Sequence, residues 1–313
     1  MKQLPKVGVA LPGTLGIDDF EAAIRPTEEA RSKVSAFTFD LNGLVFAPLD
    51  VLISLLFLLN ELATDGHSVN VEWDARQSGA LGYAERMGFF ELLSTEVAVV
   101  PERPSGSTYE TYRDSNPLIL EMTGVPPGAQ GAEAEEALNR LDERLRVNLV
   151  GTASEETLDD LWTFAAETLG NIFEHSGAAT PGVVAAQRYA SPKRGPRISI
   201  VIADAGLGIP KTIRDGNPAA AKMNDKDIIL TAFRDGLSRR AEKGRGCGLT
   251  QCARVAMKHQ ANLRVRVGRV WAKLVTRSEK AGITIGFFED EAATISGTQI
   301  ALDLYLDRLR RAV

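Results

Sequence analysis

The chain has 313 residues, of which 44% are hydrophobic and 25% are charged, and its formal net charge is −5 at pH 7. This length accommodates two ordinary domains, and the composition is typical of a globular protein with a sizeable core. An acidic chain without a long basic run lacks the positive surface that non-specific nucleic-acid binding requires, so we expect no nucleic acid among its partners.

The sequence also argues against a membrane protein and against a disulfide-rich protein. The first 15 residues contain no sustained apolar core and do not resemble a signal peptide. The most apolar run, 51–59, is shorter than the ~20 residues of a transmembrane helix. Cys247 and Cys252 have no second pair or histidine cluster beside them, which argues against structural zinc and excludes a disulfide framework. We therefore expect a cytoplasmic protein without a membrane segment.

The first half of the chain begins with residues 1–32, which lack clear periodicity and are interpreted as an N-terminal extension. Strand and helix patterns then alternate, at 36–39, 49–62, 69–73 and 80–87. Strand, helix, strand and helix in this order predict a small parallel βαβ unit packed against helices.

A connection and a helix follow. Proline and glycine punctuate residues 100–131, which predicts an irregular linker with one short strand at 118–120. Residues 132–149 have leucines at helical spacing and charged residues on the other faces. Leu138, Leu141, Leu145 and Leu149 form this stripe, which we expect to pack on its own domain; the alternative is a homodimer seam.

The next helix carries the first candidate site residues. Ser154 is a plausible N-cap, followed by Glu155 and Glu156 at the positive end of the helix, which we expect to extend to about residue 176. Helical spacing places Glu167 and Asn171 on one face, away from the apolar stripe. His175 falls on the same face.

The second half is rich in β-forming runs, at 183–189, 198–202, 263–267, 283–288 and 299–305. With three main helices, these five strands predict a two-layer α/β sandwich. Asp204 follows the apolar run 198–202, in the sequence Asp-Ala-Gly-Leu-Gly-Ile. A carboxylate there could accept a hydrogen bond from an exocyclic amine, and Gly206 and Gly208 would let the backbone approach a ligand closely. The alternative is an ordinary turn rich in Asp and Gly.

Residues 210–243 are polar and broken by glycine and proline, around a short apolar helix at 228–233. Gly244, Gly246 and Gly248 then lead into a predicted helix at 249–259. Backbone amides at a glycine-rich helix N-terminus bind phosphate, and Lys243 and Arg245 would add positive charge.

Taken in order, Glu167-x-x-x-Asn171, Asp204-x-Gly-x-Gly-Ile209, Gly244-x-Gly-x-Gly248 and Gly297-Thr298 closely resemble the ATP-binding site of the GHKL superfamily. That superfamily includes gyrase, the heat-shock chaperone ATPase, histidine kinases and MutL. The resemblance covers about residues 150–313, and it implies a GHKL-type ATP-binding domain, with its leading helix, at 132–313.

The resemblance implies a role for each matching residue. Asn171 would bind Mg²⁺, and Glu167 would be the catalytic residue that orients or deprotonates water. The adenine would be held by Asp204 and, often through water, by Thr298. The implied nucleotide-binding set is Asp204, Gly206, Gly208, Ile209, Lys243, Gly244, Arg245, Gly246, Gly248, Leu249 and Thr298. Some histidine kinases have Lys or Arg where this chain has Glu174, which puts one phosphate contact in question; His175 could face the phosphates or be packed.

The first half carries a looser resemblance. Residues 46–49 and 83–90 are similar to STAS-like regions that precede some bacterial GHKL modules. This resemblance covers about residues 33–125 and implies a small STAS-like α/β regulatory domain. The alternative for 83–90 is plain core packing. No catalytic constellation stands out in this half, and His67 is interpreted as an exposed loop residue.

Together these features predict a magnesium-dependent ATP-binding switch protein with slow hydrolysis, which regulates a protein partner of unknown identity. The alternatives are a serine-type protein kinase that acts on a separate partner, and a non-catalytic ATP sensor. Histidine autokinase activity is not expected, because none of the three histidines precedes the domain on a suitable helix. Gyrase or MutL function is expected to require a transducer domain after residue 313.

Overall fold

The computed structural model describes residues 6–74, 79–105, 107–126, 132–175, 180–190, 195–239, 247–276, 283–287 and 292–309. The chain forms two compact units: unit 1 is Met1–Asn116 with Asp290–Ile295, and unit 2 is Pro117–Glu289 with Ser296–Val313. Among the described helices, none combines the length and the hydrophobicity that a membrane span requires.

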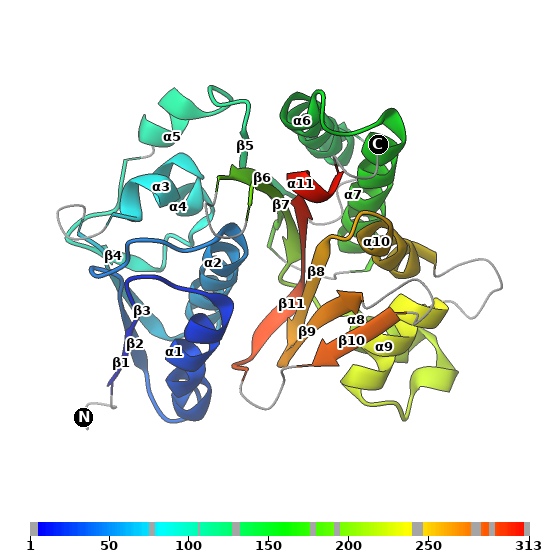
Figure 1. The fold of residues 1–313 in the computed structure, drawn as a ribbon. Helices are drawn as coiled ribbons and strands as arrows, with labels where there is room; N and C mark the ends of the chain where they lie inside the picture. The colour runs from blue at the N-terminus through cyan, green and yellow to red at the C-terminus, as the bar shows by residue number, and fades with distance from the viewer. Residues whose placement is uncertain are drawn as a thin grey trace. The chain divides into compact units, whose positions relative to one another are not determined.

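Unit 1 contains a four-stranded parallel sheet in the order β1-β2-β3-β4 (Figure 1). Helix α1 (Ile17–Ala30) follows the first strand, and α2 (Leu49–Thr64) joins the second strand to the third. The parallel α/β arrangement predicted for this half is therefore confirmed. The strands are β1 (Lys6–Ala10), β2 (Ala36–Asp40), β3 (Ser68–Glu72) and β4 (Ala98–Val100).

The core of unit 1 follows from the alternating direction of the side chains along its strands. Phe37, Phe39, Val69 and Val71 point to one face of the sheet and are at most 1% exposed. Helix α2 is buried without interruption from Leu49 to Leu59, which explains why its sequence is apolar on every side.

The interpretation of residues 1–32 as an N-terminal extension is wrong for residues 6–32, which are part of the fold. Strand β1 pairs with β2 in parallel, and Phe20 and Ile24 of α1 are fully buried. The local signals are weak for two reasons: β1 has only five residues, and α1 begins after Gly16 and contains Pro26. The short helices of this unit are α3 (Leu81–Arg86), α4 (Phe89–Leu92) and α5 (Ser107–Tyr112).

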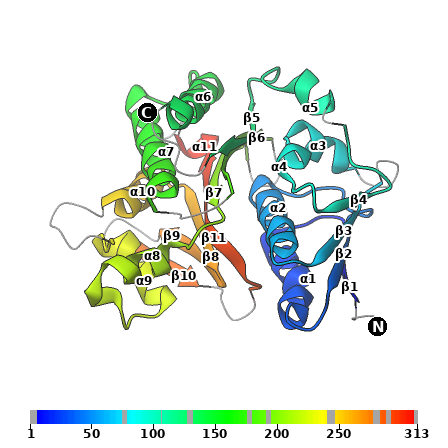
Figure 2. The ribbon, with the colours of Figure 1, turned by 180° about the vertical axis from the view of Figure 1, so that it is seen from behind.

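Unit 2 contains a seven-stranded antiparallel sheet in the order β10-β9-β8-β11-β7-β6-β5. Helices α6 (Ala132–Leu149), α7 (Glu155–His175) and α10 (Cys247–Lys258) lie on one side of it (Figures 1 and 2), so the predicted two-layer sandwich is confirmed. The strands are β5 (Ile119–Val125), β6 (Gly182–Tyr189), β7 (Arg197–Asp204), β8 (Asn262–Gly268), β9 (Val270–Thr276), β10 (Ile283–Phe287) and β11 (Ile295–Tyr305).

Three features of this sheet differ from the sequence expectation. Strand β9 was not predicted. Strand β5 is longer than the predicted 118–120 and pairs with β6, so these residues belong to the sheet of unit 2 and not to an irregular linker. Strand β11 begins at Ile295, so that Gly297 and Thr298 lie inside the strand and not before it.

The leucine stripe of α6 is internal to unit 2. Leu141, Leu145 and Leu149 are at most 2% exposed and belong to its core, and Leu138 packs against the same core. The prediction that this helix packs on its own domain is therefore confirmed.

Candidate functional site

Helix α7 begins where its cap predicts. The Thr157 N–H donates to the Ser154 Oγ at 3.2 Å, which satisfies one of the free amides of the first turn. Leu161, Phe164 and Leu169 anchor the helix in the core of unit 2, and α7 packs against β7. This packing fixes the orientation of the helix face that carries Glu167 and Asn171.

Glu167 and Asn171 are joined through the helix backbone. The Asn171 Nδ2 donates to the Glu167 carbonyl oxygen at 2.8 Å, one turn earlier. Because this contact occupies the nitrogen end of the amide, Oδ1 is the atom that could ligate a cation. Mg²⁺ prefers such oxygen ligands and keeps several waters, so a single protein ligand is sufficient. In the described ranges, no group of three His, Cys, Asp or Glu side chains forms an alternative metal site.

The Glu167 carboxylate lies at the first turn of α10. A β-carbon on Gly248 would come within 2.5 Å of the Glu167 Oε2, so glycine is what leaves space for this side chain. A carboxylate near a helix N-terminus is stabilised by the amides and the dipole there. The arrangement places an exposed carboxylate beside the helix end that the sequence assigns to phosphate.

Helices α7 and α10 also contact each other through buried side chains, and this part of their interface is structural. Thr168 Oγ1 and Cys252 Sγ are 3.5 Å apart, and Cys252 is fully buried. Burial raises the pKa of this thiol to about 12, so Cys252 is a packing residue and not a nucleophile.

Asp204 is the last residue of β7 and is only 5% exposed. Its Oδ1 accepts a hydrogen bond from the Gly206 N–H at 2.7 Å, and the backbone N–H of Thr298 also donates to the carboxylate. Burial raises the pKa of Asp204 to about 6, against the opposing effect of these two donors. Near neutral pH, the group is a mostly ionised acceptor that is held in a fixed orientation by backbone on both sides.

Two glycines close to the backbone of this site leave no space for a larger residue. Gly297 has φ +88°, and a β-carbon on it would lie 1.9 Å from the Asp204 carbonyl oxygen. Gly208 has φ +76°, and its β-carbon would lie 2.8 Å from the Val267 Cγ1. Both positions therefore require glycine for conformation and for space. The resemblance implies no role for Gly297, although a glycine inside a β-rich run indicates a close backbone approach.

Ile209 and Leu249 lie at the starts of helices and contribute to the core. Ile209 begins α8 (Ile209–Gly216) and packs partly buried against the core of unit 2. Leu249 in the first turn of α10 is 8% exposed and belongs to that core. Their proposed contacts with a nucleotide stay predictions.

The segment after Asp204 is folded as far as residue 239. It contains α8, a short 3-10 helix (Pro218–Ala220) and α9 (Asp225–Asp235). The Arg214 Nε donates to the Met223 carbonyl oxygen at 3.1 Å, and the Asn217 Nδ2 donates to the Ser238 carbonyl oxygen at 2.9 Å. The first contact joins α8 to the residues before α9, and the second joins the residues after α8 to those after α9.

Several predicted site residues cannot be placed in this geometry. Lys243, Gly244, Arg245 and Gly246 lie outside the described residues. The backbone of Glu174 and His175 belongs to α7, but their side chains are outside the described part of the structure.

Residues 157–304 match the family model described as histidine kinase-, DNA gyrase B-, and HSP90-like ATPase. The matched range includes Glu167, Asn171, Asp204, Gly248 and Thr298. No family match supports the STAS-like resemblance of the first half. A comparison with curated proteins gave no match.

Proposed function

We propose that this chain, which carries a GHKL-type ATPase domain at residues 157–304, is a magnesium-dependent ATP-binding switch that hydrolyses ATP slowly and regulates a partner protein. The family match supports ATP binding. The observation that carries the assignment of the pocket is Asp204, a buried carboxylate at the end of a central strand that is oriented by two backbone N–H groups.

Asp204 suits adenine in particular. Its carboxylate would accept a hydrogen bond from the exocyclic amine of adenine, with its remaining lone pairs occupied by the Gly206 and Thr298 amides. Guanine has a carbonyl oxygen at the corresponding ring position, which would face the carboxylate without a shared proton. A buried polar group that is left unpaired is costly, so the pocket should discriminate between the two bases.

Asn171 and Glu167 would act at the phosphate end. The Asn171 Oδ1 has the chemistry of a Mg²⁺ ligand, since its amide nitrogen is held by the helix backbone. A bound Mg²⁺ would reduce the negative charge of the phosphates and help to fix their position. Glu167, one turn earlier, would orient a water molecule and accept its proton as the water oxygen bonds to the γ-phosphorus and the bond to the leaving ADP breaks.

The switch would involve two parts of the chain, a lid segment and unit 1. The segment 210–243, which contains α9 and resembles the lid region of GHKL proteins, would act as the lid over the phosphates. Unit 1, a parallel α/β unit, would be the regulatory part, and the loose STAS-like resemblance of its sequence supports that role. We also propose a cytoplasmic location, which a composition with only two cysteines supports.

The test is incubation of the purified full chain with ATP labelled at the γ-phosphate, with Mg²⁺ or with a chelator. The proposal predicts slow release of free labelled phosphate that requires Mg²⁺. Tight ATP binding without any release would favour a non-catalytic sensor, and label on a protein would favour a kinase. Absence of ATP binding under all conditions would contradict the proposal.

A further inference from the structure

The Asp204 carboxylate has a limited number of hydrogen-bonding sites. An ionised carboxylate has about four acceptor sites on its two oxygens. The Gly206 N–H donates to Oδ1 at 2.7 Å, and the Thr298 N–H also donates to the carboxylate. These two amides can donate to a neutral carboxyl as well, because each needs only an oxygen lone pair. A proton and a ligand that reach Asp204 must therefore use the sites that remain.

The two protonation states of Asp204 offer opposite chemistry to a ligand. The ionised carboxylate only accepts hydrogen bonds, whereas the neutral carboxyl presents one O–H donor. The 6-amino group of adenine donates and suits the ionised form. The 6-oxo group of guanine or hypoxanthine accepts and suits the neutral form. Because Asp204 is only 5% exposed, a mismatched pair would stay unsatisfied and would weaken binding.

The neutral form of Asp204 is populated at mildly acidic pH. Burial raises the pKa of Asp204 from 3.8 to about 6, and the N–H groups of Gly206 and Thr298 oppose this rise. The acceptor form therefore predominates above about pH 6, and the donor form predominates below it. An ordinary exposed carboxylate would stay ionised through this range.

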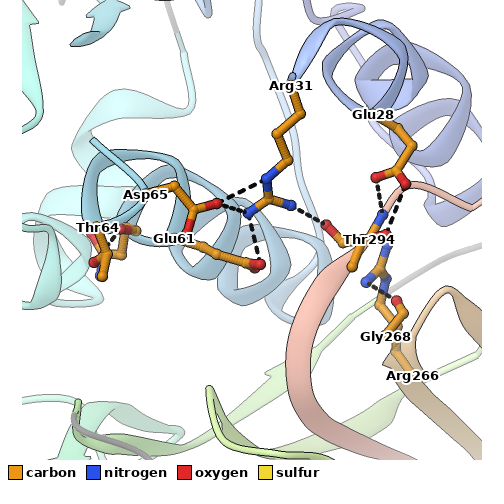
Figure 3. A network of polar contacts seen from close by, with 9 residues as sticks. Glu28, Arg31, Glu61, Thr64, Asp65, Arg266, Gly268 and Thr294 are labelled. Carbon is orange, nitrogen blue, oxygen red and sulfur yellow. Dashed lines mark hydrogen bonds and ion pairs between the residues drawn. The ribbon is translucent and has the colours of Figure 1, made fainter. Parts of the chain in front are cut away.

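Charged groups on the elements around Asp204 have other contacts. On β8, Arg266 donates to a carbonyl oxygen of the turn that follows the strand, at 3.1 Å (Figure 3), and Arg269 in that turn is exposed. Arg264 of β8 pairs with Asp303 of β11 at 2.7 Å. On β6, β7, α7 and α8, the charged groups with contacts elsewhere include Arg188, Arg197, Glu167, Lys211, Arg214 and Asp215. Among the described residues, burial and the two backbone amides are the influences on the Asp204 pKa.

We propose that Asp204 selects the base by its protonation state: the ionised carboxylate takes an adenine nucleotide, and the protonated carboxyl takes a 6-oxopurine nucleotide. The proposal rests on the proposed function, in which the base binds beside Asp204. The two states differ by one proton that is exchanged with solvent, so binding of a nucleotide and binding of this proton are linked. Acidification would thereby release ATP from the switch and admit a 6-oxopurine nucleotide in its place.

The affinities of the full chain for ATP and for inosine triphosphate (ITP), measured by calorimetry with Mg²⁺, test the proposal. ITP has a 6-oxo group and the same triphosphate as ATP, so titration of the phosphates cancels in the ratio of the two affinities. Between pH 7.5 and pH 5.5, the preference for ATP should fall by roughly 10- to 100-fold, because a pKa of about 6 lies within this range. Asp204→Asn cannot titrate, so its ratio should not depend on pH. Asp159→Asn, at an exposed position of α7, should follow wild type.

Proton exchange on binding supplies a second measurement, which needs no variant. Calorimetry at pH 6 in buffers of different ionisation enthalpy counts the protons that are bound or released with each nucleotide. ATP selects the ionised form of Asp204 and ITP selects the protonated form. ATP should therefore release more protons than ITP does, by up to about one proton. Equal proton counts for the two nucleotides would contradict the proposal.

The outcomes separate this proposal from the proposed function. If wild type binds ATP but its preference over ITP is the same at both pH values, base selection by Asp204 is wrong while the proposed function stands. A preference that changes equally in Asp204→Asn would assign the effect to another group and would also overturn the proposal. If wild type binds neither nucleotide at either pH, the proposed function itself fails. If Asp204→Asn does not fold, the proton counts of wild type decide.

Discussion

Asp204 and Thr298 are direct partners across the ladder of β7 and β11, and the N–H of Thr298 donates to the Asp204 carboxylate. The acceptor proposed for adenine is therefore built from two strands that are distant in sequence. Its other donor, the Gly206 N–H, comes from the turn that follows β7.

The buried Asp204 should make stability depend on pH. Its folded-state pKa of about 6 lies above the ordinary 3.8, so the native state holds a proton more strongly than the unfolded state. The favourable contribution is complete below the ordinary pKa and is lost as pH rises to about 6, by an amount of about 2–3 kcal/mol. Urea unfolding of wild type and Asp204→Asn between pH 3.5 and pH 7.5 measures this difference, since the other groups titrate in both proteins. Two curves that stay parallel across this range would show that Asp204 does not titrate as described.

Asn171 should act through the metal. Asn171→Ala is expected to weaken binding of ATP with Mg²⁺ by roughly 10-fold, which corresponds to about 1.4 kcal/mol, because one oxygen ligand is removed. Binding of ADP in the presence of a chelator should change much less. Calorimetry under both conditions makes the comparison, with Thr163→Ala on the same helix as the control. Equal losses with and without metal would indicate a general defect of α7.

Gly297 should not tolerate a side chain. In Gly297→Ala, the new β-carbon would meet the Asp204 carbonyl oxygen at 1.9 Å and the backbone has φ +88°, so both strain and collision oppose it. Gly268 also has positive φ, +55°, but nothing within 4 Å of its β-carbon, so Gly268→Ala is a control for strain alone. We expect Gly297→Ala to lose more unfolding free energy than this control, by about 1–3 kcal/mol, and to bind ATP poorly. Similar losses in the two variants would mean that the contact at Asp204 is not tight.

Glu167 should matter for turnover and not for binding. Glu167→Gln keeps the size of the side chain but removes the base, and it is expected to reduce phosphate release by roughly 10²- to 10⁴-fold with ATP affinity nearly unchanged. Asp159→Asn, an exposed carboxylate on the same helix, is the matched control. Hydrolysis that continues at the wild-type rate in Glu167→Gln would remove this residue from the mechanism.

Local signals explain what the sequence could predict. Ser154 with its following glutamates marks the start of α7, and the apolar run before Asp204 marks β7 as a central strand. The order of the glycine motifs and the Glu167–Asn171 spacing then suffice for the two-layer fold of unit 2. These features are encoded within short stretches of chain, where spacing and residue type carry the information.

Contacts between distant residues explain what the sequence could not predict. Glu28 and Thr294 are 266 positions apart, and nothing local in either stretch indicates that they meet. The same holds for β1 and α1, whose weak local patterns become a strand and a helix only through pairing with β2 and burial of Phe20 and Ile24. The raised pKa of Asp204 is likewise a consequence of burial by the assembled sheet.

The central claim is that an adenine nucleotide binds beside Asp204, and a calorimetric titration with ATP and GTP tests it most directly. Wild type should bind ATP and discriminate against GTP. Asp204→Ala should lose roughly 10- to 100-fold in ATP affinity, about 1–3 kcal/mol for the unpaired amine, and should lose that discrimination. Asp159→Ala, at an exposed position of α7, should behave as wild type. Unchanged ATP affinity in a folded Asp204→Ala variant would contradict the account.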